Sequence, residues 1–175
     1  MESRPCSGLT SQTFLGVSYV NELVARLTGN AVASVTNINR TLDADPRTFP
    51  FGCSIYADFS HDNQMGPIYT VLDLHKPSFD LPTDRITKSP WVTSQLVPFG
   101  ARLVVEKYTC HQSYAKDKSV EWVRILNDDK VIEVPNCAVR GKGGLCGLAA
   151  FVDTLKYAMG GAADDWAKCQ SIKTL

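Results

Sequence analysis

Apolar residues recur at helical spacing in three parts of the chain. The first part covers residues 17–27 and is followed by Gly29, a residue type that commonly ends helices. The second part follows Asp62, and the third covers residues 148–159 and stops at Gly160. This pattern predicts three helices, each with one face packed inward. The inward positions of the second helix are expected to be Met65, Ile68, Tyr69 and Leu72.

Other segments have the composition of β-strands. Residues 54–59 form a short β-prone run without a helical period, which predicts a buried strand. Residues 103–108 alternate between two faces and predict a second strand. Two further β-rich runs, 120–126 and 130–134, are separated by the polar residues 127–129 and predict a hairpin.

The remaining segments are polar connections. Residues 1–13 are rich in Ser, Thr and Gly and predict a disordered lead-in, and residues 30–50 and 75–98 show no clear period. The sequence has no internal repeat, and 175 residues suit one domain with its own core. We therefore expect a single α/β domain over residues 14–175.

Charge and hydropathy argue against two kinds of partner. The chain has 18 basic and 18 acidic residues and no basic stripe with interleaved aromatic residues, so we expect no nucleic-acid partner. No apolar run approaches the length of a membrane span, so we expect no membrane insertion. Residues 1–8 contain an acidic residue and no apolar stretch, so they do not predict a secretory signal.

Six cysteines in a chain of this size predict an oxidising compartment. Asn39 begins an Asn-Arg-Thr triplet, which is an acceptor sequence for N-linked glycans. Three histidines and six cysteines offer zinc ligands, but no Cys-x-x-Cys or His-x-x-x-His spacing occurs. We therefore expect neither a metal nor a cofactor.

The candidate chemistry lies at His61 and Asp62, where the predicted strand 54–59 meets the next helix. A strand that ends at a helix N-terminus presents backbone N–H groups and the positive end of the helix dipole to an anion. A histidine there can donate to a phosphate oxygen, and a carboxylic acid can donate a proton. Spacing alone leaves an ordinary alternative open, because Asp is also a common helix cap.

Several collinear segments resemble the fungal histidine acid phosphatases of the phytase type. The matching segments are Val17–Thr28, Phe49–Asn63, Val97–Glu106, Val123–Asp128, Asn136–Cys146 and Trp166–Cys169. The second of them reads Tyr-Ala-Asp-Phe-Ser-His-Asp-Asn over residues 56–63 and contains the His61-Asp62 pair. The resemblance runs in order from Gly16 to Cys169, and it is to the C-terminal portion of such enzymes only.

This resemblance implies a partial histidine-phosphatase (phosphoglycerate-mutase-like) α/β domain. In that family a central sheet flanked by helices is assembled from both ends of the polypeptide. This chain would supply the second group of strands, and the N-terminal half, with the strand that carries the nucleophile, would be lacking. A truncated gene model, a splice form and a decayed paralogue would all give such a sequence, and whether it folds alone stays open.

The resemblance also implies phosphomonoester hydrolysis through a phosphohistidine intermediate. Asp62 would be the general acid that protonates the leaving alcohol, with an optimum below neutral pH, and His61 would bind a phosphate oxygen. The family's nucleophile is a histidine in an Arg-His-Gly motif, and His61, His75 and His111 all lack that context. We therefore expect little turnover from this chain alone.

The substrate implied for the intact family is phytate or a simpler phosphate ester, and the sequence does not distinguish between them. One alternative is a catalytically dead truncated pseudoenzyme or a phosphate-binding fragment that retains the anion site. Another is a structural or interaction fragment, because a sheet that lacks a partner strand exposes backbone and apolar surface.

For the cysteines, the resemblance implies a disulfide between Cys137 and Cys146, which stand nine positions apart. Two others match family cysteines whose partners lie in the lacking half, and two have no clear counterpart. The pairing of these four stays open; they are Cys110 and Cys169, and Cys6 and Cys53. Because members of the family are usually secreted, the resemblance also implies an extracellular glycoprotein.

Overall fold

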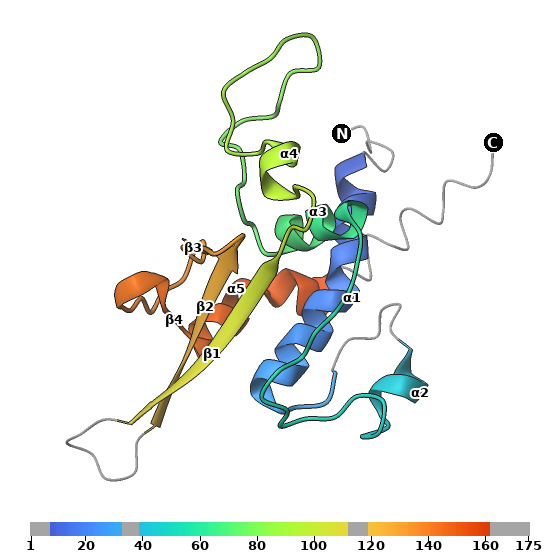
Figure 1. Cartoon of the computed structure of the whole chain (residues 1–175), viewed down its shortest axis with the longest axis vertical. Helices are drawn as coiled ribbons and strands as arrows, with labels where there is room; N and C mark the ends of the chain where they lie inside the picture. The colour runs from blue at the N-terminus through green and yellow to red at the C-terminus, as the bar shows by residue number, and fades with distance from the viewer. Residues whose placement is uncertain (1–7, 33–38, 112–118, 162–175) are drawn as a thin grey trace. The chain divides into compact units, whose positions relative to one another are not determined.

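The computed structural model describes residues 8–32, 39–111 and 119–161. The chain divides into two compact units, one formed by residues 1–71 and 155–175 and the other by residues 72–154. We call the first the helical unit and the second the sheet unit, and Figure 1 shows the elements of each. These units are two separate clusters of contacts, and the single domain over residues 14–175 stays a prediction.

The helical unit contains α1 (Gly8–Thr28), α2 (Arg40–Asp43), α3 (Asp62–Val71) and a short π-helical turn, η2 (Tyr157–Gly161). Helix α1 ends as predicted, because Gly29 has a φ of 71° and donates its N–H to the Ala25 carbonyl over 2.8 Å. The helix begins earlier than expected. Residues 8–13, which were predicted to be part of a disordered lead-in, are helical.

The core of the helical unit lies between α1 and α3, which pack against each other. The inward face of α1 matches the predicted periodicity, since Val17 and Val20 are fully buried. Tyr69 of α3 is fully buried too, and Ile68 beside it is 8% exposed. The buried side chain of Asn21 donates to the Ala158 carbonyl over 3.0 Å, and this bond ties η2 to α1.

The sheet unit contains α4 (Thr93–Leu96), β1 (Leu103–His111), β2 (Ser119–Asn127), β3 (Lys130–Ile132), η1 (Lys142–Gly144), β4 (Cys146–Gly147) and α5 (Leu148–Thr154). Strand β2 is central and antiparallel to its neighbours, with β1 on one side and with β3 and β4 paired at different points along it. The predicted hairpin is confirmed. Its turn residues Asp128 and Asp129 have φ values of 47° and 65°, as a type I′ turn requires.

One face of β2 carries the core of the sheet unit. Val123 and Ile125 are fully buried on this face, where α5 packs against β2. Phe151 of α5 is 1% exposed and Leu148 is 7% exposed, so both contribute to the same core. The mixture of a helix and a β-sheet confirms the expected α/β class at the level of a partial domain.

The structure contradicts the predicted buried strand over residues 54–59. This segment has no regular secondary structure, and its large apolar side chains Ile55 and Phe59 are 82% and 97% exposed. A strand needs a partner for its backbone hydrogen bonds and a cover for its apolar face. Within the described residues no strand pairs with this segment, so its β-prone composition is not enough to form one.

Other boundaries also differ from the sequence prediction. The helix expected over residues 148–159 is broken, because α5 ends at Thr154 and a separate turn begins at Tyr157. The break falls at the boundary between the two units, so the two halves of this segment pack in different cores. The short helices α2 and α4 lie inside connections that were expected to be irregular.

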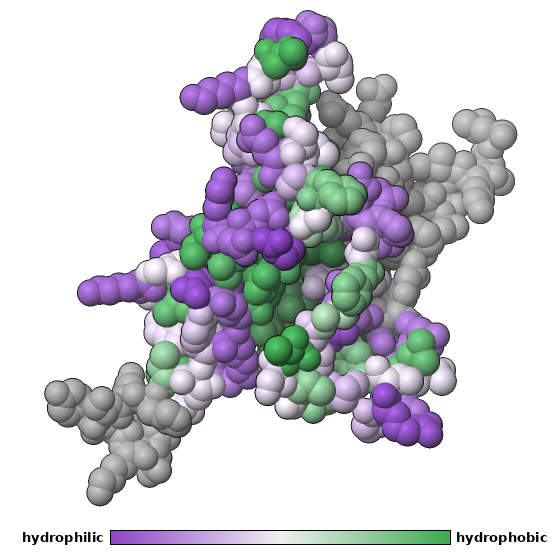
Figure 2. Space-filling view, in the orientation of Figure 1, coloured by the Kyte–Doolittle hydropathy of each residue, from purple (hydrophilic) through white to green (hydrophobic). Residues whose placement is uncertain are grey.

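Much apolar surface is exposed. Figure 2 shows apolar residues lying between hydrophilic ones on the face of the molecule that it presents. Among the described residues, Phe59, Ile86 and Phe99 are almost completely exposed. None of the described helices has both the length and the apolar character that crossing a bilayer requires.

Candidate functional site

The His61-Asp62 pair lies at the start of α3, as the sequence predicts. The His61 carbonyl accepts hydrogen bonds from the N–H groups of Gln64 and Met65, over 3.0 and 3.1 Å. These bonds make His61 the residue that caps the helix and Asp62 the first helical residue. Both residues are exposed, so a ligand could reach either one.

The first turn of α3 is held by its own side chains. The Asp62 carboxylate accepts from the N–H of Asn63 over 2.8 Å, and the Ser60 hydroxyl donates to the Gln64 side chain. Asp62 is therefore not the N-cap residue of α3, although one of its carboxylate oxygens accepts from the N–H of the next residue. Its other oxygen makes no hydrogen bond that involves another described residue, which leaves it accessible for proton transfer.

A cluster around Arg26 holds the segment that leads to this pair. The Arg26 guanidinium donates to the Asp58 carboxylate over 2.6 Å and lies 3.8 Å from the carboxylate of Glu22. Its carbon Cζ also lies 5.0 Å from the centre of the Phe49 ring and 5.1 Å from that of the Tyr56 ring. Arginine over aromatic rings is attracted to their negative faces, so this cation has favourable contacts with each neighbour.

The electrostatics of this cluster favour the charged form of the arginine. Burial alone would lower the pKa of Arg26, but the hydrogen bond and negative charge of Asp58 outweigh it and raise that pKa above its ordinary value. Burial raises the pKa of Glu22, and the negative charge of Asp43 adds to the effect. The Arg26 side chain is 15% exposed and that of Asp58 is 41% exposed, so the pair is partly screened by water.

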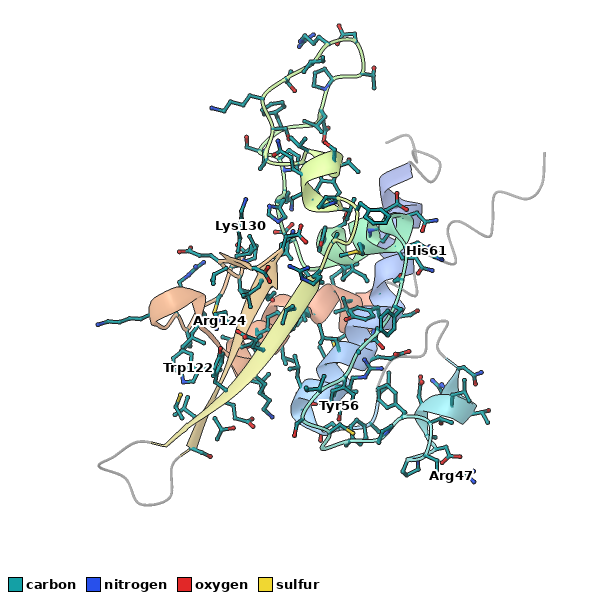
Figure 3. The ribbon with its side chains drawn as sticks, in the orientation of Figure 1. Arg47, Tyr56, His61, Trp122, Arg124 and Lys130 are labelled. Atoms are coloured by element: carbon teal, nitrogen blue, oxygen red, sulfur yellow. A yellow bond between two sulfur atoms is a disulfide. The ribbon has the colours of Figure 1, made fainter. Side chains whose placement is uncertain are left out.

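Tyr56 is the second anchor of the same segment. Its hydroxyl accepts from the Cys53 N–H over 3.0 Å and donates to the Pro50 carbonyl over 3.1 Å. Figure 3 shows Tyr56 and His61 at opposite ends of the extended stretch that leads to α3. Arg26 is not among the site residues that the sequence predicts. No sequence motif links this arginine to Asp58, which lies 32 positions later in the chain, so the sequence gives only a weak indication of their contact.

The predicted disulfide between Cys137 and Cys146 is confirmed, with their Cα atoms 6.1 Å apart. Cys53 and Cys110 are exposed free thiols, whereas Cys6 and Cys169 lie outside the described residues. The predicted glycosylation site Asn39 is exposed and accepts from the Leu42 N–H over 3.4 Å at the start of α2.

A small cavity lies beside the disulfide and is unrelated to the His61-Asp62 pair. Its lining includes Glu133, Arg140 and the glycines that follow Arg140, and neither His61 nor Asp62 contributes to it. Arg140 already donates to the Glu133 carboxylate over 3.0 Å and to the Val134 carbonyl over 3.2 Å. In the part of the chain that the structure describes, no three side chains gather in a way that could hold a metal ion.

The family follows from comparison with known proteins. The model of the histidine phosphatase superfamily (branch 2) matches residues 9–128, which include all of α1 but its first residue, the Arg26 cluster, the His61-Asp62 pair and the paired strands β1 and β2. This chain therefore belongs to the histidine phosphatase superfamily.

Its relatives include several fungal proteins named Phytase A. The chain is 40% identical over 160 residues to that of Arthroderma benhamiae, with 89% of this chain and 34% of the relative covered. It is 39% identical over 159 residues to Phytase A of Penicillium oxalicum, with 88% and 33% covered. It is 37% identical over 158 residues to Phytase A of Emericella nidulans, with 88% and 32% covered. The chain spans about a third of the length of these curated relatives.

Proposed function

We propose that this chain carries the proton-donor part of a phosphomonoester hydrolase of the phytase or acid phosphatase type. The observation that carries the proposal is the His61-Asp62 pair, exposed at the first turn of α3 within the segment matched by the family model. Relatives named Phytase A that share 35 to 40% of their aligned residues support phosphate esters as the substrate class.

In the proposed reaction, a histidine nucleophile attacks phosphorus while the bond between phosphorus and the alcohol oxygen breaks. Asp62 donates its proton to the departing oxygen, and His61 donates a hydrogen bond to a non-bridging phosphate oxygen. Water then attacks the phosphohistidine, the Asp62 carboxylate accepts the proton of that water, and phosphate leaves. The N-terminus of α3 adds a favourable electrostatic field for the phosphate group.

The nucleophile is not assigned to any residue of this sequence. None of His61, His75 and His111 is preceded by Arg and followed by Gly. We therefore propose that the 175-residue chain by itself binds phosphate and turns over phosphate esters slowly or not at all. A chain that retains the anion site without hydrolysis, as a pseudoenzyme or a phosphate-binding fragment, is the second candidate, and the same missing motif favours it.

Secretion into an oxidising compartment is part of the same proposal. Two observations support it: the Cys137–Cys146 disulfide and the exposure of Asn39 in its Asn-Arg-Thr triplet. Disulfides persist in secreted proteins and are rare in the cytosol.

Two measurements on the 175-residue chain test the proposal. Isothermal titration with inorganic phosphate is expected to show saturable binding that His61→Gln weakens at least fivefold, while the control His75→Gln does not weaken it. Hydrolysis of p-nitrophenyl phosphate is expected to be near background. No phosphate binding in the folded chain would refute the anion site. Rapid hydrolysis with an acid-labile phosphoenzyme would refute the proposal that no residue of this sequence is the nucleophile.

A further inference from the structure

The segment that delivers His61 and Asp62 to α3 has few internal supports. Residues 54–61 have no regular secondary structure, and most of their side chains are exposed. An irregular segment is ordered only if other contacts offset its backbone entropy, which is about 1–2 kcal/mol for each residue fixed. The contacts that order this segment therefore also set the position of the pair.

Helix α1 supplies such contacts at two points. Near its C-terminal end, Arg26 binds Asp58 over 2.6 Å and lies over the Tyr56 ring. Farther toward its N-terminus, α1 meets α3 so closely that a Cβ atom on Gly16 would lie 2.4 Å from the Pro67 carbonyl oxygen. Arg26 is ten positions after Gly16, which corresponds to about 15 Å along the helix. Along the chain, the His61-Asp62 pair therefore lies between Asp58 and Pro67, and both of these residues contact α1.

The distance along the chain makes the Asp58 anchor effective. His61 is three positions after Asp58, and an extended chain advances at most about 3.6 Å for each position. Fixing the Asp58 carboxylate on α1 therefore confines His61 to a small region beside the first turn of α3. Apart from the Ser60–Gln64 bond within the first turn of α3 itself, the nearest anchor before His61 without the Arg26–Asp58 bond is Tyr56, two positions earlier than Asp58.

The chemistry of the anchor requires arginine. The guanidinium lies over both the Phe49 and Tyr56 rings while one of its N–H groups reaches Asp58. A planar, delocalised cation can make the stacking and the directed hydrogen bond at once, whereas the compact ammonium of lysine cannot reproduce that geometry. The side chain is also only 15% exposed, which distinguishes it from an ordinary surface ion pair.

We propose that Arg26 is a positioning residue that acts through Asp58 to hold His61 and Asp62 in the geometry that binds the phosphate group. This inference rests on the proposed function of the pair. It assigns no contact with the substrate to Arg26, because the ion pair involves Asp58 and lies before the helix start.

The test uses NMR on the folded 175-residue chain. Titration with inorganic phosphate is followed at the His61 imidazole C–H resonances, and hydrogen exchange is followed at the Gln64 and Met65 amides, which donate to the His61 carbonyl. The variants are Arg26→Gln, Asp58→Asn and the two combined. The matched control is Arg47→Gln, because Arg47 forms a 2.6 Å ion pair with Asp45 and Figure 3 shows it well away from His61.

Each single variant is expected to weaken phosphate binding at His61 about fivefold, and the double variant is expected to be no weaker than either one. Arg47→Gln is expected to bind like the wild type. If Arg26→Gln fails to fold, Asp58→Asn decides the question, because this side chain is 41% exposed and its loss costs little packing. Wild-type affinity and an unchanged His61 response in Asp58→Asn would overturn the inference.

The exchange rates separate this inference from the proposed function. If the wild-type chain shows no phosphate response at His61, the proposed function fails. The amide exchange rates alone then test whether Arg26 positions the start of α3. Faster exchange at Gln64 and Met65 in Asp58→Asn, but not in Arg47→Gln, would support positioning by Arg26. Equal exchange rates in both variants would then overturn it.

Discussion

Gly16 of α1 and Pro67 of α3 lie in direct backbone contact: a Cβ atom built on Gly16 would be 2.4 Å from the Pro67 carbonyl oxygen. Pro67 is buried inside α3, where proline removes a helical hydrogen bond. A glycine in one helix therefore faces the backbone of the other at its proline. This close contact fixes the point along α1 at which α3 crosses it. It therefore also fixes where the first turn of α3, with His61 and Asp62, lies relative to α1.

Gly16→Ala is expected to destabilise the helical unit by about 2 kcal/mol. Alanine is more favourable than glycine inside a helix by about 1 kcal/mol, but overpacking a rigid contact costs about 1–3 kcal/mol. Because the obstacle here is backbone, the cost is at the upper end, about 3 kcal/mol, which leaves a net loss of about 2 kcal/mol. Urea unfolding followed by circular dichroism measures the difference. A variant as stable as the wild type would show that α1 and α3 do not cross as closely as described.

Removing the Cys137–Cys146 disulfide is expected to destabilise the sheet unit by about 2–3 kcal/mol, because a short closed loop restricts the unfolded chain by that amount. Cys146 lies in β4 and pairs with Val123 of β2, so the loss is felt in the central strand. Thermal unfolding of the Cys137→Ser/Cys146→Ser double variant measures it. The control Cys53→Ser changes an exposed free thiol and is expected to leave the melting temperature unchanged. Equal melting temperatures for both variants would contradict the structural role of the disulfide.

Lowering the pH is expected to weaken the pairing of β1 with β2, because Glu106 becomes protonated. The hydrogen bond from Arg124 holds the pKa of Glu106 below its ordinary value, and the Tyr108 hydroxyl adds a second hydrogen bond. The folded state therefore binds fewer protons than the unfolded state. The stabilisation is fully present above the ordinary pKa of about 4.5 and is lost as the pH falls through the lower folded value.

The check is a comparison of wild type and Glu106→Gln by urea unfolding at several pH values between 6 and 3. Because the substitution removes the titrating group, the stability difference between the two proteins is expected to shrink steadily as the solution becomes more acidic. A difference that stays constant over this range would mean that the Glu106 carboxylate gains nothing from Arg124.

Expression through a secretory pathway is expected to add one N-linked glycan at Asn39. The residue is exposed, and its triplet is the single acceptor sequence in these 175 residues. Mass spectrometry before and after enzymatic deglycosylation measures the glycan. Thr41→Ala is expected to abolish it, whereas Thr41→Ser preserves the acceptor sequence and is expected to retain it. An unmodified secreted wild-type chain would contradict the assignment.

The sequence predicted the elements whose stability is local or lies close along the chain. The helical period of residues 17–27 matches α1, and Gly29 ends that helix with a positive φ. The polar residues between the two β-rich runs form the turn of the hairpin, because Asp128 and Asp129 tolerate that conformation. The start of α3 at Asp62 could also be predicted from the sequence, because helix capping depends on residues close along the chain.

What the sequence could not predict depends on distant partners. Residues 54–59 have the composition of a strand, but composition does not reveal whether a partner strand is present. The Arg26–Asp58 bond joins positions 32 apart with no shared motif. The break between α5 and η2 depends on how contacts divide into two units. Each of these features is a property of tertiary packing, and local pattern has no information about it.

The central claim is that Asp62 donates a proton to the departing alcohol, and the dependence of hydrolysis on the leaving group tests it most directly. The measurement uses a chimera in which this chain replaces the matching third of Phytase A from Arthroderma benhamiae. Glycerol phosphate needs a proton donor for its alcohol, whereas p-nitrophenyl phosphate has a good leaving group and needs one far less.

Asp62→Asn is expected to lower kcat for glycerol phosphate by at least about 100-fold, a typical effect of losing a general acid, and to lower kcat for p-nitrophenyl phosphate much less. Asn63→Ala, a change at the next position, is expected to affect the two substrates equally. A folded chimera without activity, or an Asp62→Asn variant with the same loss on both substrates, would contradict the claim.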